Sequence, residues 1–165
     1  MMRKTLAVLA AVALVSVAGC SLFRSPPPKL FPVDLCLQAS PQLQWYKERS
    51  HTLYVRVYPL TVVDAFASGD VGELLSDPPP SIPGVIGTPQ SRVLYPDTNQ
   101  KLSFDAAEGQ TFSNLGIVAG YYELKGSAKH LVNTADLRTG SCYTVKFGPS
   151  GIEGGAPATP KGETK

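Results

Sequence analysis

The chain has 165 residues, with 15 lysines and arginines against 13 aspartates and glutamates, so its formal net charge is +2. Two of the basic residues, Arg3 and Lys4, lie at the extreme amino terminus, and the rest of the chain is balanced in charge. A surface without a basic surplus lacks the clustered cations that phosphate binding needs, which argues against nucleic acid as a partner.

The amino-terminal stretch is typical of a secretory signal peptide. Arg3 and Lys4 are followed by residues 6–18, an uncharged run of thirteen residues that are mostly Ala, Val and Leu. A membrane-spanning helix needs about twenty apolar residues, whereas the apolar centre of a signal peptide needs about seven to fifteen. We therefore predict that residues 1–19 are a signal peptide.

Cys20 stands where such a signal peptide is cut. The tetrapeptide Val17-Ala18-Gly19-Cys20 resembles the lipobox of bacterial lipoproteins, in which the cysteine receives a diacylglycerol and becomes the acylated first residue. Two or more acyl chains hold a protein firmly to a membrane. Ser21, in place of Asp at the second mature position, implies by the same resemblance the periplasmic face of a Gram-negative outer membrane. The alternative is a plain signal peptide with an incidental cysteine.

Composition divides the rest of the chain into a tether, one domain and a tail. Residues 20–30 comprise the lipidated N-terminus and a proline-rich, stiff, extended spacer. Residues 31–147 are long enough for a single domain with its own core. Residues 148–165 (GPSGIEGGAPATPKGETK) are rich in Gly, Pro and Lys, and we predict that this tail is disordered.

Period-two alternation of apolar residues dominates the domain. In TLYVRVY (residues 52–58) every second residue is Leu or Val, while LGIVAGYY (115–122) is apolar or small on both faces, as in a strand covered on both sides. Six or seven short strands separated by Pro and Gly turns favour an all-β sandwich. The further predicted strands are residues 33–38, 91–95, 100–104, 130–132 and 141–147.

Residues 61–77 (TVVDAFASGDVGELLSD) break this pattern, because their apolar residues recur at helical spacing. Thr61 precedes Asp64 by three positions and Asp70 precedes Glu73 by three, the spacing of N-terminal capping pairs. We predict two short helices, or one broken helix, inserted after the second strand. The prolines that follow end any helix.

Two cysteines lie in the domain, Cys36 and Cys142, and pairing is the default in an oxidising periplasm. Each alternates with apolar neighbours, so each points to the face of its strand opposite the apolar one. If the first and last predicted strands are neighbours, the two sulfurs meet on one side of the sheet. The alternative is two separate free thiols.

Few residues indicate catalysis or metal binding. The two histidines, His51 and His130, have no Cys, His or carboxylate at a metal-ligand spacing. The segment Gly140-Ser141-Cys142-Tyr143 is superficially similar to a papain-type nucleophile region, but that site needs a downstream histidine and none follows Cys142. The sequence has no phosphate-binding glycine loop and no Gly-x-Ser-x-Gly motif. We expect neither an enzyme nor a cofactor.

The longest polar interruption between predicted strands is ASPQLQWYKERSH, residues 39–51. It holds the only tryptophan, beside a tyrosine and near an arginine, which is the composition of a hot spot in a protein interface. The alternative is that Trp45, or Leu43, folds back and fills the end of the sandwich. The candidate partner-binding residues are Gln42, Leu43, Gln44, Trp45, Tyr46, Lys47, Glu48 and Arg49.

The order of these features resembles the TssJ family, also called VasD or Lip, the outer-membrane lipoproteins of the type VI secretion system. The matching segments are Val55-Arg56-Val57-Tyr58-Pro59-Leu60, the helical excursion that follows it, and Leu115-Gly116-Ile117-Val118-Ala119-Gly120-Tyr121. The resemblance covers roughly residues 33–147 and rests on structural rather than catalytic motifs. It implies a transthyretin-like β-sandwich with a short helical insertion after the second strand.

The resemblance also implies a role and a partner. Family members anchor the trans-envelope complex by binding the periplasmic C-terminal region of the inner-membrane protein TssM, alongside TssL. The loop between the first two strands, residues 41–50 here, contributes to that contact, although Gln42-Leu43-Gln44-Trp45-Tyr46 replaces the Asn-Pro-Asp and Gly-Arg-Pro pattern of many members. Lys129-His130-Leu131 likewise stands near the place of their usual Trp-Arg. The alternative function is a lipoprotein sandwich that binds a small ligand or an envelope polysaccharide, which a deep aromatic-lined pocket would favour.

Overall fold

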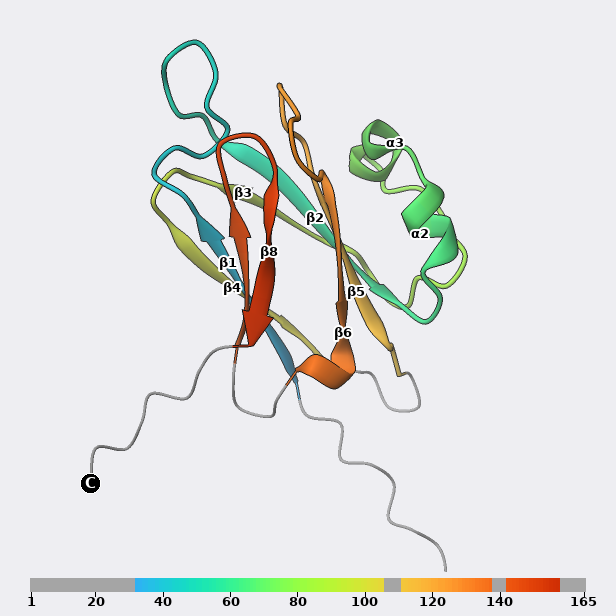
Figure 1. The fold of residues 1–165 in the computed structure, drawn as a ribbon. Coiled ribbons are helices and arrows are strands. Elements are labelled where there is room, and N and C mark those ends of the chain that lie inside the picture. Colours follow the sequence, from blue (N-terminus) through green and yellow to red (C-terminus); the bar gives the residue numbers. More distant parts are fainter. Residues whose placement is uncertain (1–31, 106–110, 138–141, 158–165) are drawn as a thin grey trace, which may run out of the picture.

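The computed structural model describes residues 32–105, 111–137 and 142–157, which form two packed four-stranded sheets (Figure 1). The strand order is β4-β1-β7-β8 in the first sheet and β3-β2-β5-β6 in the second, and β1 and β7 pair in parallel. The predicted all-β sandwich is confirmed. The strands are β1 (Val33–Ala39), β2 (Leu53–Leu60), β3 (Gln90–Leu94), β4 (Asn99–Phe104), β5 (Asn114–Ala119), β6 (Lys129–Asn133), β7 (Tyr143–Phe147) and β8 (Ile152–Pro157).

The main core lies between the two sheets and is built by the alternation seen in the sequence. Leu35 and Leu37 of β1 are fully buried, and so are Val55 and Val57 of β2 and Val145 of β7. Each such side chain contributes about 1.5–3 kcal/mol on leaving water. The hydrophobic effect therefore holds the two sheets face to face.

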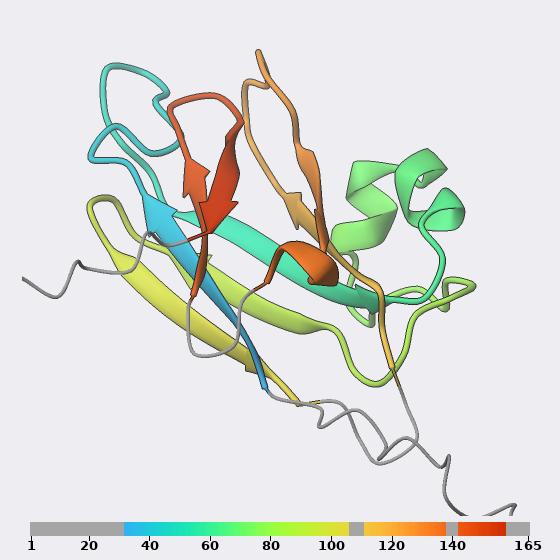
Figure 2. The same cartoon turned by 60° about the horizontal axis from the view of Figure 1, so that its bottom comes forward.

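A second, smaller core lies on the outer face of the second sheet, where the helical insertion packs. Helices α2 (Asp64–Ser68) and α3 (Val71–Leu75) lie on this face in both views of the fold (Figures 1 and 2). At Gly116 of β5, a β-carbon would lie 2.9 Å from the Phe66 ring, so glycine allows this close approach. The prediction that this strand is covered on both faces is confirmed.

The predicted cap of the second short helix is confirmed, and that of the first is wrong. Asp70 Oδ1 accepts hydrogen bonds from the backbone N–H groups of Gly72 and Glu73, at 2.7 and 3.1 Å. Thr61 does not cap α2, because its hydroxyl donates to the carbonyl of Gly84 at 3.0 Å, and Val63 occupies the cap position. A competing partner across the loop thus overrides the local spacing.

Two cations fasten the carboxyl ends of these helices to the second sheet. Arg56 of β2 is 2% exposed and donates to the carbonyl of Leu74 at 3.1 Å. Lys129 of β6 donates to the carbonyl of Gly69, just after α2, at 2.9 Å. The last carbonyls of a helix have no partner within the helix, so these side chains satisfy them. A short 3-10 helix, η1 (Thr134–Asp136), follows β6.

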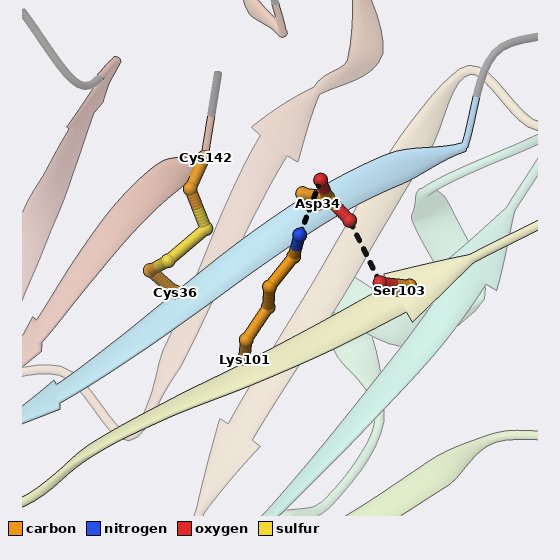
Figure 3. Close-up of a disulfide and its surroundings, with 5 residues drawn as sticks. All are labelled: Asp34, Cys36, Lys101, Ser103 and Cys142. Atoms are coloured by element: carbon orange, nitrogen blue, oxygen red, sulfur yellow. Dashed lines mark hydrogen bonds and ion pairs between the residues drawn. A yellow bond between two sulfur atoms is a disulfide. The ribbon is translucent and has the colours of Figure 1, made fainter. Parts of the chain in front are cut away.

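The predicted disulfide between Cys36 and Cys142 is confirmed, with a Cα–Cα distance of 5.7 Å (Figure 3). The parallel pairing of β1 and β7 brings the two cysteines together across a sequence separation of 106 residues. Nearby on β1, Asp34 pairs with Lys101 at 2.8 Å and accepts from the Ser103 hydroxyl at 2.7 Å. These contacts, from Lys101 and then Ser103, hold the pKa of Asp34 below its usual range.

The prediction of a disordered tail from residue 148 is wrong for its first ten residues. Residues 152–157 form β8, which pairs antiparallel with β7 and makes the eighth strand of the sandwich. The glycines that suggested disorder have a packing role, because a β-carbon at Gly155 would lie 2.3 Å from the Tyr143 ring. Gly154, with φ of 103°, also adopts a conformation that other residues avoid.

Several predictions fall outside the described residues. They are the signal peptide (1–19), the lipidated Cys20 with its tether to residue 30, and the end of the tail (158–165). Among the residues that the structure does describe, no helix is both long enough and apolar enough to cross a membrane.

Candidate protein-binding site

Four loops lie together at the end of the sandwich opposite the start of β1, at the top of Figure 1. Backbone hydrogen bonds join them: Trp45 N–H donates to the Pro149 carbonyl at 2.8 Å, Lys125 N–H donates to the Ser150 carbonyl at 3.0 Å, and Asp97 N–H donates to the Ser40 carbonyl at 3.3 Å. They therefore form one surface, here called the loop end. Its members are the β1–β2 loop (40–52), the β3–β4 turn (95–98), the β5–β6 loop (120–128) and the β7–β8 loop (148–151).

Two of the eight predicted partner-binding residues are buried, which corrects their assignment. Leu43 is fully buried in the main core, so it is Leu43 that fills this end of the sandwich. Gln44 is 3% exposed; its side-chain amide donates to the carbonyl of Thr52, and its Oε1 accepts from the N–H of Tyr122 at 3.1 Å. Both residues hold the loop in shape and are shielded from a partner.

A tight turn from Tyr46 to Arg49 lies at the centre of the β1–β2 loop. These two residues exchange backbone hydrogen bonds of 3.0 and 3.3 Å. Lys47 and Glu48 between them have φ values of 49° and 61°, and positive φ at both central positions is the pattern of a type I′ turn, which favours Asn and Gly. Each non-glycine residue in this conformation costs about 1–2 kcal/mol. The turn is thus held by its surroundings, and no local signal predicts it.

Three aromatic rings support the turn. The ring centroids of Tyr46, His51 and Tyr122 lie 5.8–6.1 Å apart in pairs, and His51 Nε2 lies 3.0 Å from the carbonyl oxygen of Tyr46. Aromatic pairs at these separations contribute about 0.5–1.5 kcal/mol beyond the area that they bury. The cluster fixes the β1–β2 loop against the β5–β6 loop.

Large apolar side chains remain exposed at the loop end. Trp45 is 44% exposed, so the alternative in which it fills the sandwich is wrong, and Tyr122 and Leu124 of the β5–β6 loop are 67% and 50% exposed. Aromatic residues ringed by charged ones are typical of protein interfaces. Of the other predicted residues, Tyr46 is half-buried, and those exposed to solvent are Gln42, Lys47, Glu48 and Arg49.

Sequence reasoning missed Tyr122 and Leu124, which reach the surface from a different loop. The alternation assigned Tyr122 to a strand running to residue 122, but β5 ends at Ala119. The signal that could have located these residues is the glycine at position 120, directly before two tyrosines, because glycine inside a strand pattern often marks its end or a bend.

The loop end also holds an open hollow of about 390 Å³, lined by Tyr46, Tyr122 and Glu123. A further hollow of about 250 Å³ adjoins the loop end at Ser40, Pro41 and Asp97. Another, of about 360 Å³, lies away from it along the proline-rich segment 79–89. Within residues 32–105, 111–137 and 142–157, no three His, Cys, Asp or Glu side chains are placed to hold a metal ion. The arrangement at the loop end is suited to holding another molecule through aromatic and charged contacts.

The two sheets, the two-helix insertion and the closed loop end define an all-β sandwich of the kind found in type VI secretion lipoproteins. The fold expected from the resemblance to the TssJ family is therefore confirmed. No family model matches the sequence, and no curated protein matches it.

Three solved structures carry this comparison. The type VI secretion lipoprotein TssJ1 of Pseudomonas aeruginosa has a TM-score of 0.62 at 19% identity, covering 79% of this chain and 98% of that one. Lip of Serratia marcescens, described as a membrane-bound component of the system, has a TM-score of 0.59 at 17% identity, covering 79% and 98%. A chain in the structure described as the TssM C-terminal domain from EAEC has a TM-score of 0.61 at 14% identity, covering 78% and 97%. At these identities the similarity establishes the fold.

Proposed function

We propose that this chain is an outer-membrane lipoprotein subunit of the type VI secretion membrane complex. Lipid on Cys20 anchors it to the periplasmic face, and the loop end binds the periplasmic C-terminal region of TssM, with TssL in the same complex. The role is anchoring rather than catalysis. The proposal is supported by the fold, which matches TssJ1 and Lip over 98% of each of those chains.

One observation carries the assignment of the binding face. Trp45 is exposed, while the backbone N–H groups of Trp45 and of its neighbours Gln44 and Tyr46 are all hydrogen-bonded. Leu43, two residues before Trp45, is buried in the core. A rigid, exposed tryptophan loses little conformational entropy when a partner covers it, which is why such residues dominate binding energy. Arg49, at the end of the turn that follows Trp45, is also exposed and adds a charged group to the same loop.

The first prediction tests this face. The double substitution Trp45→Ala and Arg49→Ala should weaken binding of the TssM periplasmic region by about tenfold or more, as expected for the loss of a hot spot. The measurement is a pull-down and a Kd with the full-length protein in detergent. The matched control is Leu131→Ala with Arg92→Ala, on strands β6 and β3, which should bind as the wild type does. Equal affinity of the two double variants would place the interface elsewhere.

The second prediction tests the anchor. Cys20→Ser should release the protein from the outer-membrane fraction into the soluble periplasmic fraction, because no acyl chain can then be attached. Ser21→Asp keeps the thiol and should move the protein to the inner-membrane fraction. Retention of the Cys20→Ser variant in the outer membrane would contradict the lipoprotein assignment.

A further inference from the structure

The hollow at the loop end has aromatic walls and an acidic rim. The Tyr46 and Tyr122 rings lie 5.8 Å apart between centroids, tilted by 57°, and Glu123 completes the lining. It is open to solvent and has a volume of about 390 Å³. It has room for one long side chain, and it opens on the same surface as Trp45.

Glu123 brings negative charge to this space. In the part of the chain that the structure describes, Lys101 forms a salt bridge with Asp34, and Glu123 forms none. The faces of aromatic rings also carry partial negative charge. A carboxylate beside two tyrosine rings therefore favours a positively charged group.

The fold already places cations near two tyrosine rings, and one of these rings, Tyr46, belongs to the hollow. Lys47 Nζ lies 5.2 Å from the centroid of the Tyr46 ring, and the Arg56 guanidinium lies 5.5 Å from that of Tyr54. Lys47 is not among the residues that line the hollow. Lys47 thus lies near the Tyr46 ring, whereas the Tyr122 ring, which is 67% exposed, and Glu123 remain open to a cation from another molecule.

We propose that this hollow receives one lysine or arginine side chain of the partner protein, which lies against the Tyr122 ring and pairs with Glu123. The inference rests on the proposed function, because it names the chemistry by which the TssM periplasmic region is held. It assigns a binding role to the β5–β6 loop, beside the β1–β2 loop that carries Trp45.

The test compares substitutions in the full-length protein, with the TssM periplasmic region as the probe and Kd measured at low and at moderate salt. Glu123→Gln should weaken binding about tenfold and flatten its salt dependence, since one desolvated charge pair is lost. Tyr122→Leu should also weaken it about tenfold, whereas Tyr122→Phe should stay within about twofold because the ring is kept. Asp105→Asn, beyond the far end of β4, is the charge-matched control and should bind as the wild type does.

The same assay identifies the basic residue. Each lysine and arginine of the probe is replaced by alanine, and at one of them the effect of Glu123→Gln should disappear, as a double-mutant cycle requires for a direct pair. The inference alone is overturned if wild-type protein binds tightly and Glu123→Gln behaves like Asp105→Asn, or if no probe residue couples to Glu123. If the wild-type protein does not bind the probe at all, the proposed function falls together with the inference.

Discussion

Arg56 is a charged side chain in the second, smaller core, and its partners explain how it is tolerated there. Its guanidinium donates to the carbonyl of Leu74 at 3.1 Å, to the hydroxyl of Ser91 at 2.8 Å and to that of Tyr54 at 2.7 Å. It also donates to the Ser76 carbonyl. A buried charge without such partners would be strongly destabilising, so these bonds both satisfy Arg56 and fasten α3 to the sheet.

The third prediction concerns this side chain. Arg56→Leu should lower the free energy of unfolding by about 2–4 kcal/mol, because carbonyl groups buried at the end of α3 lose their donor. The free energy of unfolding of Arg56→Lys should lie between those of the wild type and Arg56→Leu, since one ammonium cannot reach all four acceptors. Urea unfolding followed by circular dichroism gives the values, with Arg92→Leu on the exposed side of β3 as the control expected within about 0.5 kcal/mol of wild type. A loss in Arg56→Leu no larger than in Arg92→Leu would contradict this account.

At the residue level, the sequence correctly predicted which face of a strand a side chain lies on, but it did not predict what covers that face. Alternation correctly placed Arg56 on the face of β2 opposite the main core, but that face is covered by helices whose docking the pattern does not encode. Gln44 shows the same limit, because a glutamine in a polar loop gives no sign that it will be 3% exposed. Burial depends on which segments meet in space, and local spacing carries little of that information.

The β1–β2 loop carries Trp45, the main proposed binding residue, and also contains a turn with an unfavourable backbone conformation. Its turn places Lys47 and Glu48 at positive φ, where Asn and Gly are the favoured residues. The surrounding aromatic cluster and the hydrogen bonds to the β7–β8 loop offset that cost. The loop keeps its shape because Leu43, Gln44 and the aromatic cluster anchor it to its neighbours, whereas the turn residues Lys47 and Glu48 contribute little to that shape.

The fourth prediction follows from that cost. Lys47→Asn together with Glu48→Gly should raise the free energy of unfolding by about 1 kcal/mol, since both new residues tolerate positive φ. Lys47→Ala with Glu48→Ala removes the same charges without relieving the backbone and should leave stability nearly unchanged. Thermal and urea unfolding of the two double variants decide the matter, and equal stability would show that the turn is unstrained.

The strands were predictable where their residues are apolar, and β8 was not. Its segment IEGGAP has little of the β-branched and aromatic character that marks a strand. It forms an edge strand because β7 offers a free edge and because glycine at position 155 lets the backbone pass over the Tyr143 ring. The contact that requires glycine joins Gly155 to Tyr143 on another strand. Composition carries no information about such a contact and therefore predicted disorder.

At the scale of the whole molecule, a disulfide joins Cys36 of β1 to Cys142, the residue directly before β7. The fifth prediction is that Cys36→Ala with Cys142→Ala lowers the free energy of unfolding by up to about 4–5 kcal/mol, the chain-entropy estimate for a loop of about 100 residues. Treatment of the wild-type protein with reductant should give a similar shift, and reductant should have no effect on the double variant. A loss below about 1 kcal/mol would mean that the link adds little to the hydrophobic core.

The parallel pairing of β1 and β7 has a consequence for reach. It places the start of β1 and the end of β8 at the same end of the sandwich, and the loop end at the other. Twelve residues lie between Cys20 and Val33, and the thirteen residue-to-residue steps extend at most about 45 Å. β1 adds about 23 Å. With a lipid on Cys20, as proposed, the loop end can therefore reach up to roughly 65–70 Å from the bilayer. The length of the tether, more than the size of the sandwich, then sets how far from the bilayer the loop end can bind its partner.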